Sequence, residues 1–135
     1  MKQDIVNVDG NQGFAGFVYG MHRAEAMLAA GHATTVALIC SDTYSKLIGP
    51  DDRGTSLLFG DGCAVAILSH AAGPFRVVAS KVKQLSEFNR LFAVFEGGAR
   101  DSYRAASPHI EMQGAALLEL LGKHAPSFVD AFLVD

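Results

Sequence analysis

Hydrophobic residues recur at helical spacing in the stretch 15–30, which is the clearest regular pattern in the chain. One apolar stripe there consists of Phe17, Met21, Ala24 and Leu28. Gly31 follows the last periodic position and is typical of a helix stop. Most of the other positions in the stretch are apolar too, which predicts a helix buried between two layers.

The β-type stretches are shorter. Residues 3–9 alternate weakly between polar and apolar and predict a short strand, whereas the apolar run 34–41 predicts a strand buried on both faces. Residues 55–69 predict two strands joined by a hairpin at their Asp-Gly pair, and 76–83 predict one more strand.

Loops and a C-terminal helix complete the pattern. Residues 42–54 and 84–108 are expected to be irregular, and 113–125 predict a helix, after which Pro126 begins or kinks a last one. An apolar helix placed between buried strands predicts a layered α/β protein.

Composition narrows the class of protein. The chain has 135 residues, of which 50% are hydrophobic and 19% charged, so it fits one globular domain with surface that something else covers. The net charge is −3 and no Lys/Arg cluster occurs, which argues against nucleic-acid binding. The apolar runs are far shorter than a membrane span and no secretion signal is seen, so no membrane partner and a cytoplasmic location are expected.

The thiols and imidazoles show no metal pattern. Cys40 and Cys63 lie within apolar runs, which predicts two buried free thiols and no disulfide. The five His residues lack the paired spacing of a metal site, so neither a metal nor a cofactor is expected.

The stretch "NVDGNQGFAGFVYGM" (7–21) predicts a strand, a Gly-rich turn and a helix start. Its Gly10, Gly13 and Gly16 do not fit the dinucleotide fingerprint, and neither a P-loop nor a G-x-S-x-G elbow is present. The geometry suits an acyl-transfer elbow, in which a Cys at the helix start attacks a thioester. The turn carries Phe14 instead.

Several motifs together resemble β-ketoacyl-acyl-carrier-protein synthase III of the thiolase superfamily. "NQGFAGFVYGM" resembles its active-site segment, and "GPDDRGTSLLFGDGCAVAIL" resembles its Asp-Arg-Gly…Phe-Gly-Asp-Gly signature; "EGGAR" and "EMQG" resemble later landmarks. The resemblance implies a partial thiolase-like layered α/β fold, with a mixed sheet and a buried helix. It also implies acyl transfer from acyl-coenzyme A, then condensation with malonyl-acyl-carrier protein, in fatty acid or polyketide biosynthesis.

The resemblance assigns roles residue by residue. Phe14 stands where the family has its nucleophilic Cys, Arg53 matches an Arg that contacts the coenzyme A nucleotide, and Phe59 matches an aromatic that lines the pocket. The alternative for Arg53 is a surface ion pair with Asp51 or Asp52. For Phe59 the alternative of core packing is favoured.

The Gly-Asp-Gly turn and the family's other catalytic residues also bear on whether the chain is active. For Asp61, turn chemistry is favoured over a role in the site. Neither Cys40 nor Cys63 matches the nucleophile position, His124 does not match the family's catalytic His, and that His and its Asn partner have no counterpart here. A phenyl ring at position 14 would also occupy space used by the acyl chain. The chain is therefore expected to be catalytically inactive.

The resemblance also implies that residues 1–135 are an incomplete thiolase-like domain: the end of the N-terminal half, a linker and the start of the C-terminal half. Two strands of the family's sheet are then absent between 3–9 and 34–41, and the helix 15–30 loses one cover. At about 25 cal/mol per Å², a few hundred Å² of uncovered apolar area costs several kcal/mol. We therefore expect a fragment, an assembly with copies or a partner, or re-paired strands.

Two other functions stay open. One is a non-catalytic ketosynthase-like subunit that pairs with an active partner. The resemblance implies that the strand before the nucleophile pairs across a dimer, so residues 4–9 are the candidate contact. The other is a small coenzyme A- or nucleotide-binding module that uses Arg53 and the Gly-rich turn. For the acyltransferase itself, the resemblance implies acyl-coenzyme A and acyl-carrier protein as partners, and a homo-oligomer or a ketosynthase-like partner is expected.

Overall fold

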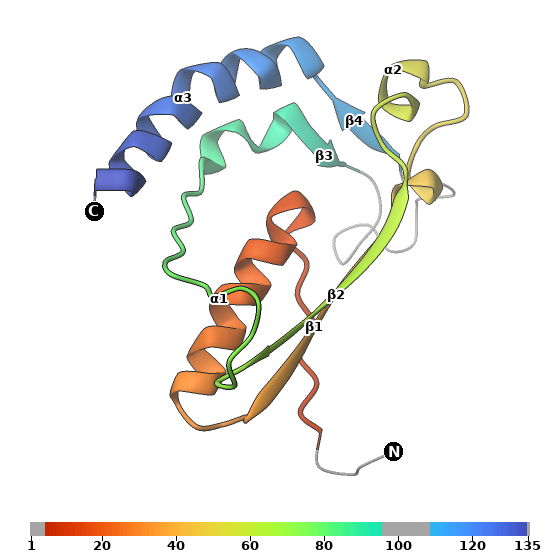
Figure 1. Ribbon diagram of the computed structural model, residues 1–135. Helices are drawn as coiled ribbons and strands as arrows, with labels where there is room; N and C mark the ends of the chain where they lie inside the picture. Colours follow the sequence, from red (N-terminus) through yellow and green to blue (C-terminus); the bar gives the residue numbers. More distant parts are fainter. Residues whose placement is uncertain (1–4, 96–108, 135) are drawn as a thin grey trace. The chain divides into compact units, whose positions relative to one another are not determined.

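The computed structural model describes residues 5–95 and 109–134 (Figure 1). Within it the chain forms two compact units, each built from two stretches of sequence. They are Met1–Ser41 with Cys63–Val82, and Asp42–Gly62 with Lys83–Asp135.

The predicted helix is confirmed as α1, Gly16–Ala29, in the first unit. It ends in a Schellman motif: Gly31 has φ +71°, its N–H donates to the Leu28 carbonyl, and the His32 N–H donates to the Met27 carbonyl, each over 3.0 Å. The left-handed backbone explains why glycine follows this helix.

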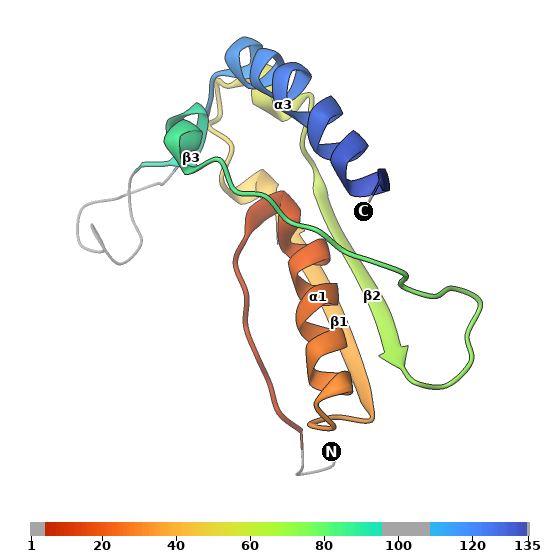
Figure 2. The same ribbon diagram turned by 90° about the vertical axis from the view of Figure 1, so that its left-hand side faces the viewer.

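Strands β1, Thr35–Thr43, and β2, Asp61–Ser69, form a two-stranded sheet and run in opposite directions (Figure 1). Helix α1 lies along this sheet (Figure 2). A Cβ added at Gly20 of α1 would overlap Leu38 Cδ1 of β1, so the missing side chain allows the helix to approach the strand closely. One face of the sheet is thereby covered.

The other face of this sheet is exposed. Ile39, Val65 and Ile67 are 64%, 60% and 67% accessible, and burial alternates along β1. The prediction that this strand is buried on both faces is therefore wrong, because α1 covers only one. The helix itself buries only Ala24 and Leu28 among its residues, so it is not enclosed between two layers, in line with the expected loss of one cover.

Of the strand predicted over 3–9 the structure describes residues 5–9, and these are irregular. Ile5 and Val6 there are 64% and 73% exposed. Neither β1 nor β2 pairs with this segment, and a strand needs a neighbour for its backbone groups. The segment instead passes along α1 (Figure 2), where a Cβ at Gly10 would lie 3.0 Å from Arg23 Nη1. The strand predicted over 76–83 is likewise irregular.

The hairpin predicted within 55–69 is also wrong. The residues expected to form its first strand instead contain a short helix, α2, Arg53–Ser56. Strand β2 begins at Asp61 itself, so the Asp-Gly pair lies in a strand and not in a turn. The Asp52 carboxylate caps α2 by accepting from the Thr55 N–H over 2.9 Å. Local capping therefore outweighs the turn preference of Asp-Gly at this place.

The second unit contains a small sheet that the sequence did not predict. Its strands are β3, Phe92–Val94, and β4, Ile110–Met112, which pair antiparallel with Phe92 opposite Met112. The unit also contains two 3-10 helices, η2, Tyr44–Lys46, and η3, Ser86–Leu91. Ile110 is 4% exposed, and its N–H donates to the Leu47 carbonyl over 2.8 Å. The predicted loop "EGGARDSYRAASP" lies outside the described residues.

Helix α3, Gly114–Val134, is continuous through Pro126. Pro126 has no N–H to bond the Gly122 carbonyl, but the loss of one hydrogen bond does not end the helix. The prediction of a helix here is confirmed, while the separate last helix is not observed. None of the described helices is both long and apolar enough to cross a membrane.

These elements confirm the α/β class. The described strands form two two-stranded sheets and not a single mixed sheet.

Candidate functional site

The turn that carries Phe14 is a 3-10 helix, η1, Gly13–Ala15, placed directly before α1. Gly13 has φ +53°, a conformation that L side chains rarely adopt, and the Ala15 N–H donates to the Gln12 carbonyl over 3.3 Å. The predicted Gly-rich turn and helix start are therefore confirmed. Phe14 is the central residue of this turn.

The N-terminus of α1 has the features of an anion-stabilising end. Its N-cap residue, Ala15, makes no side-chain capping hydrogen bond in the described structure, and the first turn contains no acidic residue. The first backbone N–H groups of a helix lack partners within the helix and carry a partial positive charge. In α1 the first of them, the Gly16 N–H, already donates to the Gly13 carbonyl of η1. A thiolate placed at the turn would be stabilised there.

Phe14 does not use this environment chemically. Its side chain is 61% exposed, and it has no lone pair, no titratable proton and no charge. The turn thus places a phenyl ring, which cannot act as a nucleophile, directly before the N-terminus of α1.

Phe59 belongs to an aromatic cluster in the second unit. Its ring stacks on Tyr44 with centroids 5.3 Å apart and 20° between planes, and it lies 5.7 Å from the Phe92 ring at 49°. Such offset and tilted pairs stabilise a core beyond the area they bury. Burial and the Asp42 charge raise the pKa of Tyr44. This packing is what the core-packing alternative for Phe59 predicts.

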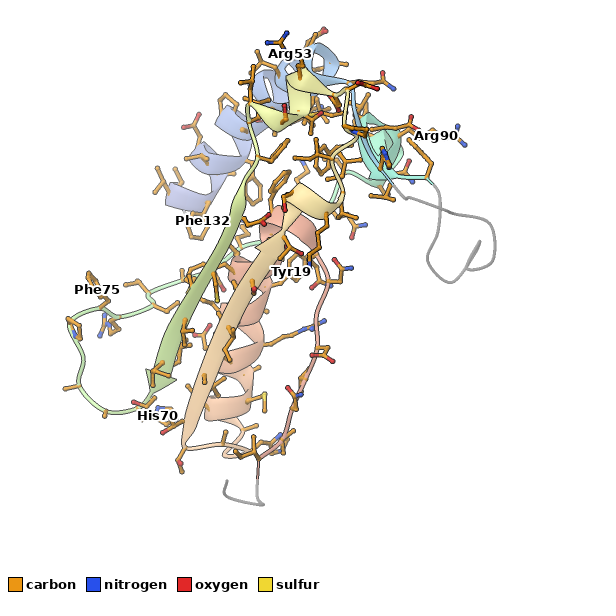
Figure 3. All side chains as sticks on the ribbon, turned by 90° about the vertical axis from the view of Figure 1, so that its right-hand side faces the viewer. Tyr19, Arg53, His70, Phe75, Arg90 and Phe132 are labelled. Carbon is orange, nitrogen blue, oxygen red and sulfur yellow. The ribbon has the colours of Figure 1, made fainter. Side chains whose placement is uncertain are left out.

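Arg53 is the first residue of α2 and is exposed (Figure 3). The Thr55 side chain and then the Thr55 N–H lower the pKa of Asp52 by hydrogen bonding, and the Arg53 guanidinium is not among the causes. Asp52 therefore acts as a helix cap, and Arg53 remains exposed to solvent next to it.

Asp61 is held by Ser45, a residue that no sequence motif singled out. The Ser45 hydroxyl donates to Oδ2 over 2.6 Å and its N–H donates to Oδ1 over 2.9 Å. These bonds, the side-chain one first, lower the pKa of Asp61. They hold the start of β2 against η2, which agrees with turn chemistry for the Gly-Asp-Gly stretch.

The three residues selected from the sequence divide between the units. Phe14 lies in the first unit, whereas Arg53 and Phe59 lie in the second.

Both cysteines are free, as predicted, but Cys63 is exposed and Cys40 is half-buried. The expectation of two buried thiols is wrong because β2 is covered on one face only. Among the described residues no group of three His, Cys, Asp or Glu side chains is arranged to hold a metal ion. Two His residues instead contact protein groups. His22 Nδ1 lies 2.9 Å from Ser80 Oγ, and Nε2 of His70, which is labelled in Figure 3, lies 3.2 Å from the Leu28 carbonyl.

Comparison with known proteins decides the family. The family model for 3-oxoacyl-[acyl-carrier-protein (ACP)] synthase III matches residues 8–85, a stretch that includes the turn, α1, β1, α2 and β2. The chain belongs to the 3-oxoacyl-ACP synthase III family. The resemblance found in the sequence motifs is thus confirmed.

Curated relatives and solved structures agree. The chain is 34% identical over 116 residues to the β-ketoacyl-ACP synthase III of Paracoccus denitrificans, covering 82% of this chain and 34% of that protein. It is 35% identical over 116 residues to that of Rhodobacter capsulatus, with the same shares. A 3-oxoacyl-ACP synthase III crystal structure superposes with a TM-score of 0.82 at 27% identity, over 94% of this chain and 42% of the other. A β-ketoacyl-ACP synthase III structure from Thermus thermophilus superposes with a TM-score of 0.66 at 22% identity. The match covers 78% of this chain and 33% of the other, and it supports the thiolase-like fold alone.

The chain spans about a third of the length of these curated relatives, 34% in both cases.

Proposed function

We propose that the chain is a segment of a 3-oxoacyl-ACP synthase III-like acyltransferase of fatty acid or polyketide biosynthesis, and that as it stands it is inactive in acyl transfer. Family membership supports the first statement. Phe14 at the centre of the η1 turn carries the second.

The chemistry explains why one residue has this effect. In acyl capture a thiolate attacks the carbonyl carbon of acyl-coenzyme A, a new thioester forms, and the coenzyme A thiolate leaves. The phenyl ring of Phe14 has no electron pair to donate to that carbon. The backbone N–H groups at the start of α1 can stabilise an oxyanion, but stabilisation without attack gives no acyl-enzyme.

A turnover assay tests the inactive state. The chain is incubated with radiolabelled acetyl-coenzyme A and malonyl-acyl-carrier protein, the substrates that this proposal assigns. We expect no 3-oxoacyl product above a blank without protein. Product above that blank would overturn the proposal of inactivity and leave the family assignment intact.

A non-catalytic subunit that pairs with an active ketosynthase, or with its own copies, is the first alternative. Apolar exposure favours it: Val6 on the N-terminal segment and Ile67 on β2 are 73% and 67% exposed. Sedimentation equilibrium of the chain distinguishes such a subunit from an isolated inactive segment. A dimer or larger species supports the subunit, and a monomer with cooperative unfolding rules it out.

A small coenzyme A-binding module is the second alternative, and exposed Arg53 favours it. Calorimetric titration with coenzyme A tests this binding. Arg53→Ala should abolish the binding heat, whereas Arg90→Ala, which removes another exposed guanidinium of the same unit, should not (Figure 3). Equal loss in both variants would indicate only non-specific charge attraction, and absence of heat with the unchanged chain would rule the module out.

We place this function in the cytoplasm. Support comes from the free thiols Cys40 and Cys63, since a reducing compartment keeps cysteines unpaired.

A further inference from the structure

We draw no further inference here: the strongest candidate, the exposed apolar face that Ile39 of β1 and Val65 and Ile67 of β2 form on the side of the sheet away from α1, carries nothing because nothing in the structure shows what covers it.

Discussion

Ser45 and Asp61 are joined by two hydrogen bonds, from the Ser45 hydroxyl over 2.6 Å and from its backbone N–H over 2.9 Å. The pair links η2 to the first residue of β2 across 16 positions of sequence. Because each carboxylate oxygen accepts one of the two bonds, the bonds favour the ionised form and lower the pKa of Asp61.

This pair predicts a loss of stability in acid. Because the pKa of Asp61 is lower in the folded chain than in the unfolded one, its contribution is present above the unfolded pKa and is lost as pH falls through the folded pKa. Thermal unfolding followed from pH 7 down to about pH 3 should therefore show a smaller decrease in Tm for Asp61→Asn than for the unchanged chain.

The Asp52 cap provides a comparison for this experiment. Its pKa is lowered for the same kind of reason, by Thr55, so Asp52→Asn should also flatten the pH profile. Asp130→Asn, in α3, is the control, because it removes the same charge without removing a hydrogen bond that the structure shows. If all three variants behaved alike, net charge and not these hydrogen bonds would govern the acid response.

Gly31→Ala should destabilise the first unit. The left-handed φ of +71° at this position costs an L residue about 1–2 kcal/mol, and the two Schellman hydrogen bonds depend on it. Urea unfolding measures the loss. Gly122→Ala serves as control, because Gly122 lies within α3 with nothing within 4 Å of an added Cβ. That control should be neutral or stabilising by about 0.5–1 kcal/mol, and an equal loss in both variants would contradict the account.

Gly20→Ala should cost about 1–3 kcal/mol, since the added methyl overlaps Leu38 Cδ1 and separates α1 from β1. Combining it with Leu38→Val should recover part of the loss, because the smaller side chain restores space. Gly16→Ala, at the first residue of α1 with open space around its Cβ position, is the matched control. Strict additivity of the Gly20 and Leu38 changes in urea unfolding would show that the two residues do not contact each other.

Phe59→Ala should destabilise the second unit by about 2 kcal/mol, because a half-buried ring loses its contacts with Tyr44 and Phe92. Phe59→Tyr, which keeps the ring, should cost much less. Equilibrium unfolding monitored by tyrosine fluorescence checks both variants, read from the change in midpoint. Equal stability of Phe59→Ala and the unchanged chain would remove the core-packing role.

Local signals in the sequence were sufficient for some elements and insufficient for others. Helix α1 and its stop at Gly31 follow from periodicity and from one glycine, which are properties of neighbouring residues. The hairpin at the Asp-Gly pair failed because the residues before it form the Asp52-capped helix α2 and no strand. Asp61 itself begins β2 and is held by Ser45, a contact between distant residues. The N-terminal strand failed because apolar alternation does not supply the neighbouring strand that its backbone requires.

The candidate site shows the same division. The Gly-rich turn and the helix start around Phe14 could be predicted, since they depend on glycine placement and helix pattern. The packing of Phe59 against Phe92 could not, because those rings are brought together by folding of the second unit.

The absence of acyl capture is the central claim, and mass spectrometry after brief exposure to acetyl-coenzyme A tests it most directly. Tryptic cleavage separates position 14, in a peptide of residues 3–23 without cysteine, from the peptides that contain Cys40 and Cys63. As a reference, Phe14→Cys combined with Cys40→Ser and Cys63→Ser reports how the restored thiol at the turn reacts. We predict that no peptide of the unchanged chain carries a thioester-linked acetyl group. A rapidly formed acetyl thioester on either native cysteine would contradict the account.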